Sequence, residues 1–349
     1  MKVVLLTRRF HNEPYGGIYK YAYYLTKKLI DIEPTIEISV LFNNSITNFP
    51  RTLIYDLILV PSKLKNLNAD IYHAVLPELS IAPIFLHKKP LITTIHDILL
   101  FHFPYERKCI AREYVKFSTK IALHSNIILT VSESSKNEIC NFFRTPEEKV
   151  IVIPNGIDLS LFKRKEKEPE NNIIGYLGGF GPRKNLFRLF KALKIVKKFI
   201  PDVILRIGGS GKVLSLINFA RKLKVLNSIE WVGYVPERKL PKFYSSLKLF
   251  VYPSLYEGFG LPPLEAMACG TPVITSNISS LRETVGKGGI LINPYDVDEL
   301  AEAIYEILTN DKLRKNLIKK GLRRAKQFSW EKTAKETLKV YKEVLKHNM

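Results

Sequence analysis

The chain has 349 residues and a mass of 40.1 kDa, so we expect two domains of ordinary size. Its hydrophobic content of 46% and charged content of 25% are typical of a soluble globular protein. Lys and Arg outnumber Asp and Glu by 54 − 33 = 21, and such a charge attracts nucleic acid, anionic lipid or phosphorylated substrates. The lysines are spread along the chain, however, and a solvated lysine-rich surface explains the charge equally well.

Cysteine usage and hydropathy exclude several other classes. Cys109, Cys140 and Cys269 have an odd count and no C-x-x-C spacing, which argues against a disulfide framework and a zinc site. They fit a reducing compartment, so we expect a cytoplasmic protein. The first apolar run, 1–7, is too short for a signal peptide, and no apolar stretch approaches the ~18 residues of a membrane span.

The chain opens with a predicted strand, a glycine loop and a helix. Residues 3–7 are typical of a buried parallel strand, and residues 18–30 repeat apolar side chains at helical spacing. Between them, Gly16 and Gly17 permit a ligand to approach the backbone closely, although a tight turn explains them as well. A full G-x-G-x-x-G is absent, so this Rossmann-like opening does not identify a dinucleotide site.

A histidine and an aspartate follow one of the later strands. We predict strands over 36–42, 53–60, 70–74 and 91–95, and His96-Asp97 stands directly after the last of these. Ligand-binding groups of α/β enzymes lie at the carboxyl ends of such strands, which favours a functional role for His96. His73, near the end of another strand, is a weaker candidate.

Residues 106–124 are predicted to form a basic, aromatic helix. This helix could lie on an anionic membrane surface. An amphipathic helix that packs on the sheet and turns its polar face to water explains the same pattern. Further along, Ser132 is a suitable N-cap for a helix over 133–143.

The pattern of strand, glycine loop and helix begins again after residue 172. Residues 163–172 are charged, contain a proline and lack large apolar side chains, so they are predicted to be the linker. A strand over 173–177 and a glycine loop follow, and Arg183 and Lys184 stand at the start of the next helix. There, cationic side chains can hold phosphate together with the helix dipole, although two solvated cations at a helix start are an alternative.

Two other patterns in the second half look functional but are better explained otherwise. Gly208 to Lys212 echo a phosphate-binding loop, but Val213 follows the lysine, which excludes a P-loop NTPase. Asp296 and Asp298 invite a metal site, yet aspartates in a first helical turn favour the helix dipole, so we predict capping.

The stretch 252–275 combines a strand end, a glycine loop and a helix with two glutamates. Glu257 precedes the loop Gly258-Phe259-Gly260, and Glu265 lies in the first turns of the helix that two prolines open. In an open α/β sheet such a loop faces the ligand crevice. Two carboxylates there can accept hydrogen bonds from the hydroxyls of a ribose or a hexose. A core helix with two surface glutamates is the alternative.

Taken together, these segments resemble the retaining nucleotide-sugar glycosyltransferases of glycosyltransferase family four, which have the GT-B fold, and among them the mannosyltransferases. The resemblance covers nearly the whole chain. The motifs that carry it are the E-x7-E signature in 254–268, His96-Asp97, 131–133, 153–158, 181–185, 233–235 and 328–330.

The resemblance implies an α/β protein with two Rossmann-like, doubly wound domains that face each other across a cleft. The first is expected to comprise 1–160 and the second 161–329. The C-terminal helix, about 330–349, is expected to cross back to the first domain.

The resemblance also implies roles for single residues. Glu265 is expected on the ribose hydroxyls of the donor, and Glu257 on the donor sugar and its phosphate. Arg183 and Lys184 are expected to neutralise the diphosphate leaving group, and His96 to contact the donor sugar near the reacting carbon. Other donor-binding positions are expected at Gly17, Gly233, Val235, Gly258, Phe259, Gly260 and Leu261.

Asp97 and Tyr19 are the expected acceptor contacts. The sequence departs from the family pattern here, because Gly17-Ile18-Tyr19-Lys20-Tyr21 stands in place of the more usual Gly-Ile-Gly-Arg-Tyr.

The expected activity is transfer of a hexose, mannose or glucose, from a nucleoside diphosphate to a glycan or lipid-linked acceptor, without metal or cofactor. The positive charge fits peripheral attachment to an anionic membrane on its cytoplasmic face, where lipid-linked acceptors reside. A sugar-nucleotide epimerase of the same fold is one alternative. A basic nucleic-acid-binding protein is another, but no clustered basic-aromatic motif supports a nucleic-acid partner.

Overall fold

The structure is a computed structural model that describes residues 1–10, 16–44, 49–164 and 171–347. Most of the predicted linker, namely residues 165–170, therefore lies outside the described residues.

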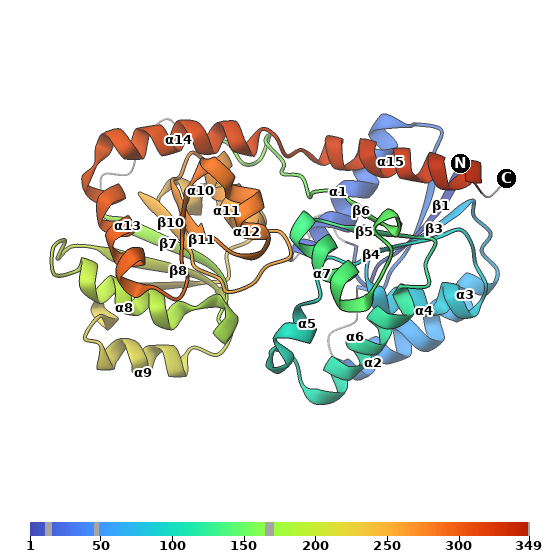
Figure 1. The fold of residues 1–349 in the computed structure, drawn as a ribbon, viewed down its shortest axis with the longest axis horizontal. Coiled ribbons are helices and arrows are strands. Elements are labelled where there is room, and N and C mark those ends of the chain that lie inside the picture. Colours follow the sequence, from blue (N-terminus) through green and yellow to red (C-terminus); the bar gives the residue numbers. More distant parts are fainter. Residues whose placement is uncertain (11–15, 45–48, 165–170, 348–349) are drawn as a thin grey trace. The chain divides into compact units, whose positions relative to one another are not determined.

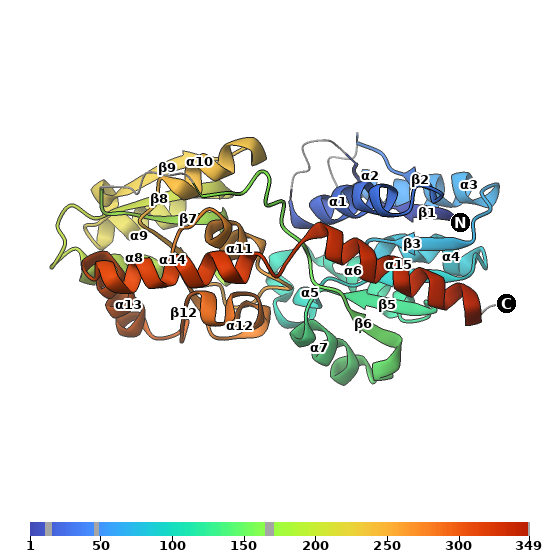
Figure 2. The same cartoon turned by 90° about the horizontal axis from the view of Figure 1, so that it is seen from above.

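The chain forms two units, each built on its own parallel sheet with helices on both faces (Figure 1 and Figure 2). The first unit comprises Met1–Gly156 and Trp330–Met349, and the second comprises Ile157–Ser329. The first unit thus ends at Gly156, slightly before the predicted boundary at residue 160.

In the first unit, six strands lie in the order β2-β1-β3-β4-β5-β6, and all neighbours are parallel. The strands β1, β3 and β4 are buried along almost their whole length, as expected for a parallel sheet covered on both faces. The strand bounds are β1 Lys2–Leu6, β2 Glu37–Leu41, β3 Ile71–Ala74, β4 Leu91–Thr94, β5 Ile127–Thr130 and β6 Val150–Val152.

The helices of the first unit include five short ones between β2 and β4. The bounds are α1 Gly17–Ile32, α2 Phe49–Ile54, η1 Tyr55–Leu59, α3 Val60–Lys65, η2 Pro77–Ser80, α4 Ile81–Phe85, α5 Leu99–His102, η3 Pro104–Glu106, α6 Cys109–Ala122, α7 Glu133–Phe143, η4 Glu147–Lys149 and α15 Trp330–His347. Ser132 caps α7 as predicted, because its side chain accepts a hydrogen bond from the Ser135 N–H.

The prediction of a strand over 53–60 was wrong. These residues are helical, and η1, a π-helical turn, joins α2 to α3 there. A short apolar run fits a strand or a helix equally well, and here burial does not alternate along it. Tyr55 and Asp56 are both buried, whereas Leu57 and Ile58 are both exposed.

The last helix, α15, packs on the first unit beside α1. Trp330 stacks on Tyr24 with ring centroids 5.3 Å apart and an interplanar angle of 5°. The Tyr341 hydroxyl lies 2.6 Å from Nδ1 of His73, whose Nε2 lies 2.8 Å from Thr94 Oγ1. Burial lowers the pKa of His73 to about 3, so its neutral ring joins α15 to the sheet and has a structural role.

In the second unit, six parallel strands lie in the order β12-β11-β10-β7-β8-β9. The strands are β7 Ile173–Gly179, β8 Ile204–Ser210, β9 Ile229–Gly233, β10 Leu249–Tyr252, β11 Val273–Ser276 and β12 Ile290–Ile292. The helices are η5 Pro182–Lys184, α8 Leu186–Val196, α9 Leu214–Lys222, η6 Leu226–Ser228, η7 Glu237–Lys239, α10 Leu240–Ser245, α11 Leu261–Ala268, α12 Ser279–Val285, η8 Gly286–Gly288, α13 Val297–Thr309 and α14 Asp311–Ala325.

Both strand orders reverse direction once. The reversal falls between β1 and β3 in the first sheet, and between β7 and β10 in the second. In open α/β sheets, ligands bind beyond the carboxyl ends of the strands at such a reversal. The loops after these four strands are therefore the places where the fold favours a binding site.

Candidate functional site

The two loops at the reversal of the second sheet are tied together by their backbones. After β7, the turn η5 presents Arg183 and Lys184, and after β10 the loop 253–260 presents Glu257. The Leu255 N–H donates to the Arg183 carbonyl over 2.8 Å. A side chain adds a second tie: Nδ2 of Asn185, a residue in the left-handed conformation with φ 63°, donates to the Pro253 carbonyl over 3.0 Å. Residues distant in sequence are thus held in one fixed arrangement.

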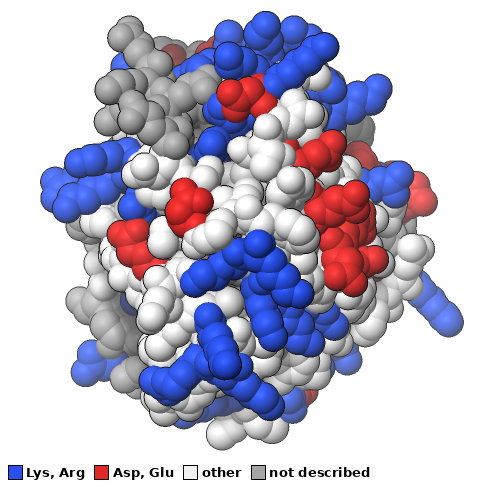
Figure 3. Space-filling model, turned by 90° about the vertical axis from the view of Figure 1, so that its left-hand side faces the viewer, with Lys and Arg blue, Asp and Glu red and all other residues white. Residues whose placement is uncertain are grey.

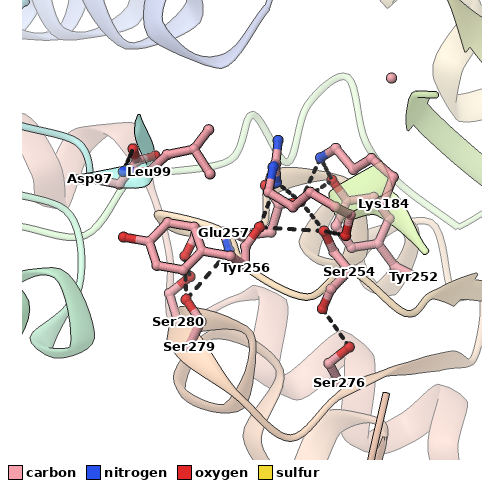
Figure 4. Close-up of polar contacts among 12 residues, drawn as sticks. Asp97, Leu99, Lys184, Tyr252, Ser254, Tyr256, Glu257, Ser276, Ser279 and Ser280 are labelled. Atoms are coloured by element: carbon pink, nitrogen blue, oxygen red, sulfur yellow. Dashed lines mark hydrogen bonds and ion pairs between the residues drawn. The ribbon is translucent and has the colours of Figure 1, made fainter. Parts of the chain in front are cut away.

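One carboxylate oxygen, Oε1 of Glu257, collects four hydrogen bonds (Figure 4). Arg183 Nη1 donates over 2.7 Å and Lys184 Nζ over 2.5 Å. The hydroxyls of Tyr252 and Ser254 donate over 3.0 Å and 2.6 Å. The Glu257 side chain is only 14% exposed, so these partners largely replace its water.

The charge state of Glu257 follows from these contacts. Burial alone would raise the pKa of its carboxyl group, but the positive charges and hydrogen bonds of Lys184 and Arg183, with Ser254, lower it to about 2. Glu257 is therefore ionised at neutral pH and holds no proton to donate. Among the described residues, its cluster contains two cations and one anion, a net charge of 2 − 1 = +1.

Lys184 and Tyr252 are themselves held in place. Lys184 Nζ donates to the Tyr252 hydroxyl over 2.6 Å and lies 4.9 Å from the centre of its ring. The ring stacks between Tyr176 and Phe250, with centroids 5.8 and 6.0 Å away. A lysine packed in this way loses little freedom when it meets a ligand, which is what a preorganised cation requires.

Two serines of α12 hold the start of the glycine loop that follows Glu257. The hydroxyls of Ser279 and Ser280 donate to the Glu257 carbonyl over 2.6 and 2.7 Å (Figure 4). Gly260 has φ +104°, and a Cβ there would come within 2.7 Å of Leu281. The predicted donor positions Gly258, Phe259 and Gly260 are buried, and Leu261 begins α11 partly exposed.

Glu265, the second glutamate of the signature, lies on α11 and is 3% exposed. The buried Tyr244 hydroxyl of α10 donates to its Oε2 over 2.8 Å. The two glutamates therefore have different surroundings: Glu257 contacts two cations, and Glu265 accepts a hydrogen bond from a phenol. The alternative of two surface glutamates is wrong.

The remaining predicted donor positions of the second unit follow β9. Gly233 ends this strand with φ +66° and is exposed, and Val235 is partly buried beside Gly208 of β8.

Within the described ranges, no three His, Cys, Asp or Glu side chains gather as a metal site. Asp296 caps α13, as predicted, through hydrogen bonds from the N–H groups of Asp298 and Glu299.

The first unit holds the other predicted residues, and His96 lies directly beyond β4. Its Nε2 is 3.2 Å from the Val75 carbonyl, and because a carbonyl only accepts, Nε2 carries the proton. Burial lowers the pKa of His96 to about 4, against smaller opposing effects of the Val75 hydrogen bond and the Glu78 charge. His96 is thus a neutral imidazole, packed edge-on against Tyr21 at 5.1 Å.

The expected acceptor residues lie on separate elements of the first unit. Asp97 accepts a hydrogen bond from the Leu99 N–H over 2.9 Å at the start of α5. Tyr19 lies on α1 with the Arg9 guanidinium 5.8 Å from its ring centre. Gly17, an expected donor-binding position, begins the same helix and is exposed.

Sequence reasoning missed the neutral partners of the site. No sequence pattern marks these residues, because their contacts depend on the order of the strands in the sheet. They are Tyr252, Ser254, Tyr244 and the serines of α12. The position of Ser254, three residues before Glu257 in a tight loop, was the one available signal.

The structure has the GT-B fold, as two solved structures of low sequence identity show. Sucrose-phosphate synthase from Thermosynechococcus elongatus superposes with a TM-score of 0.82 at 21% identity, covering 99% of both chains. HepE from Anabaena, solved in complex with UDP-glucose, superposes with a TM-score of 0.77 at 19% identity, covering 98% of this chain and 100% of HepE.

Sequence relatives identify the family. Residues 2–161 match the family described as Glycosyltransferase Family 4, and residues 159–324 match Glycosyl transferases group 1. O-antigen chain mannosyltransferase B of Escherichia coli is 35% identical over 267 residues, which are 72% of this chain and 70% of that protein. MMP alpha-(1->4)-mannosyltransferase of Mycolicibacterium hassiacum is 29% identical over 273 residues, 73% and 66% of the two chains. The chain belongs to the glycosyltransferase family of O-antigen chain mannosyltransferase B.

Proposed function

We propose that the protein is a retaining hexosyltransferase that moves mannose, or glucose, from a nucleoside diphosphate to a glycan or lipid-linked acceptor. The observation that carries the proposal is the cluster of Arg183, Lys184 and Glu257 at the reversal of the second sheet, which has the charge and the position to hold a sugar diphosphate. The relatives named as mannosyltransferases support mannose, and the HepE complex with UDP-glucose supports a nucleotide-sugar donor.

The two cations act on the leaving group. When the bond between the anomeric carbon and the diphosphate oxygen breaks, negative charge develops on the diphosphate, and Arg183 and Lys184 stabilise it. This role makes a metal ion unnecessary in the proposed reaction. Glu257 keeps both cations in position. The described hydrogen bonds of its carboxylate all use Oε1, so Oε2 is proposed to accept a hydrogen bond from a sugar hydroxyl.

Retention is proposed to occur by attack on the same face of the sugar. The acceptor hydroxyl oxygen bonds to the anomeric carbon as the diphosphate leaves, and the hydroxyl proton passes to the departing phosphate oxygen. Retaining glycosidases instead use two carboxylates that flank the bond. An ionised Glu257 bound to two cations does not fit the acid of that scheme.

Other residues are proposed to position the donor. Glu265 binds the ribose hydroxyls, and Gly17, Gly233 and Val235 approach the nucleotide with their backbones. His96 contacts the donor sugar: with Nε2–H given to Val75, its Nδ1 is the atom that can accept from a sugar hydroxyl.

A panel of nucleotide sugars tests the function. Release of nucleoside diphosphate in the presence of mannosylated glycan or polyprenyl-linked acceptors is expected for a GDP-, UDP- or ADP-linked hexose. Retention predicts that the product has the anomeric configuration of the donor, which nuclear magnetic resonance reads directly. No turnover with any donor would reject the proposal, and conversion of the donor without an acceptor would indicate an epimerase instead.

Membrane attachment is proposed to use the first unit. Ile54, Leu57 and Ile58 of α2 and η1 are 46–60% exposed, and Ile110 is 74% exposed on α6, which also contains Lys116 and Lys120. Apolar side chains beside lysines favour an anionic lipid surface. No helix in the described part of the chain is long and apolar enough to cross a membrane.

Co-sedimentation with vesicles rich in phosphatidylglycerol is therefore expected to exceed that with phosphatidylcholine vesicles, and the Ile110→Asp variant is expected to bind less. Leu214→Asp is the matched control, because Leu214 is 70% exposed but belongs to the second unit. Equal binding to both kinds of vesicle, or an equal loss in both variants, would contradict the assignment.

On the face drawn in Figure 3, Lys and Arg side chains gather in a broad group across the lower half. Asp and Glu side chains lie in smaller groups above and to the right of it, and further Lys and Arg side chains lie at the top and sides.

A further inference from the structure

The first unit contains a cavity of about 240 Å3 that is separate from the residues assigned to the donor. It lies beyond the carboxyl ends of β1 and β3, where the order of the first sheet reverses. The fold thus favours a ligand here for the same reason as in the second unit. Its principal lining residues are Arg8, Arg9, Tyr19, Glu78, Arg107 and Tyr114.

A buried ion cluster forms one wall of the cavity. Arg8 Nη2 donates to Asp56 Oδ2 over 2.6 Å and to Glu78 Oε1 over 3.0 Å, and the Arg8 side chain is 9% exposed. The Tyr114 hydroxyl donates to the same Asp56 oxygen over 2.9 Å. Both carboxylates therefore share the one cation Arg8, and the wall is rigid, because moving any member would leave a buried charge without its partner.

The rest of the lining is basic and aromatic. Among the described residues, Arg9 and Arg107 add two positive charges to the cluster of one arginine and two acids, so these five side chains sum to 3 − 2 = +1. Tyr19, Phe49 and Tyr114 line the same space. Guanidinium groups match the geometry of phosphate oxygens, and aromatic faces pack on sugar rings, so the lining suits a phosphorylated sugar.

The size of the cavity decides which substrate fits. Complete ligand pockets begin at roughly 300 Å3, so this cavity holds a fragment and not a whole nucleotide sugar. The donor diphosphate already has its two cations, Arg183 and Lys184, in the second unit. A phosphate group in the first unit therefore comes from the other substrate.

We propose that this cavity binds a phosphate group of the acceptor, together with the sugar or chain directly attached to it. Arg9 and Arg107 bind the phosphate, Tyr19 packs on the attached group, and the Arg8 cluster fixes the wall. The proposal rests on the proposed function, since it names the acceptor class of the same transfer. Tyr19, the expected acceptor contact, lines this cavity together with Arg9 and Arg107.

Titration calorimetry with small phosphate probes tests the proposal. Mannose 1-phosphate represents a phosphorylated sugar, farnesyl diphosphate represents a lipid carrier, and mannose is the uncharged control. Saturating UDP and GDP are present, so that the cations of the second unit are occupied. Arg9→Gln and Arg107→Gln are each expected to weaken binding of a phosphate probe about tenfold, the effect of one lost hydrogen bond to a charged group.

Lys108→Gln is the matched control. Lys108 is exposed beside Arg107 and does not line the cavity, so its removal lowers the net charge equally but should leave binding unchanged. Arginine-dependent binding of farnesyl diphosphate alone would assign the phosphate to a lipid carrier, and binding of both probes would show that a phosphorylated sugar suffices. No binding, equal binding of mannose, or equal binding by wild type and the arginine variants would overturn the proposal.

The donor panel run on the same variants separates this proposal from the proposed function. If nucleotide sugars are turned over but the arginine variants bind the phosphate probes as tightly as the wild type, the cavity assignment alone is wrong. If no nucleotide sugar is turned over, the transferase proposal fails whatever the probes show.

Discussion

The Lys184→Ala variant is expected to lose about 10²- to 10³-fold in kcat, the usual effect of removing one preorganised group that stabilises developing charge. Lys184 Nζ is held by Glu257 and by the ring and hydroxyl of Tyr252, so no neighbouring cation can take its place without moving that cluster. Nucleoside diphosphate release at saturating donor measures the loss. Glu257→Ala is expected to lower kcat as well, because both cations lose their common partner.

Lys194→Ala is the control for this experiment. It removes the same charge from the exposed face of α8 in the same unit, and is expected to keep wild-type turnover. The melting temperature of each variant shows whether the protein remains folded. Wild-type turnover in both Lys184→Ala and Glu257→Ala would refute the assigned roles.

The Gly209→Ala variant is expected to destabilise the second unit by about 3 kcal/mol or more, the upper range for an overpacked core. Gly209 pairs with Gly178 on the neighbouring strand, and a Cβ at Gly209 would lie 1.8 Å from the Gly178 carbonyl oxygen. Its φ of +136° adds strain for any L side chain. The obstacle is backbone, so no side-chain rotation relieves it. Thermal unfolding should show a melting temperature about 10 °C lower.

Gly179→Ala is the matched substitution, since Gly179 follows Gly178 on β7 and a Cβ there would meet nothing within 4 Å. Its melting temperature should stay near that of the wild type. Equal stability of the two variants would show that the strands can separate to admit a methyl group.

Much of the local structure of this site could be predicted from the sequence, because glycines and a change in hydrophobic periodicity mark the loops that follow strands. The glycines and the two glutamates of 252–275 indicate a strand, a loop and a helix, and the charge of Lys184 at a helix start indicates phosphate. The contact between Lys184 and Glu257 could not be predicted. It requires β7 to lie beside β10, and local sequence patterns do not reveal the order of strands in a sheet.

The region around Asp56 was the least predictable part of the fold. An apolar run with one aspartate fits an edge strand as well as a helix, and burial of that aspartate depends on Arg8, a residue 48 positions earlier. The cavity beside it was equally hidden, because its arginines come from the end of β1 and from the turn before α6. Neither segment contains a motif.

The path of α15 has a consequence for how the protein is made. The second unit is a single continuous segment, and its two ends lie together, with Ile157 bridged to Ser329. The first unit is discontinuous, because Trp330 and Tyr341 are added to its core only after the entire second unit has left the ribosome. During synthesis, the surface around Tyr24 and His73 therefore stays exposed to solvent until α15 is made. A chaperone that covers this surface would bind the half of the protein that is translated first.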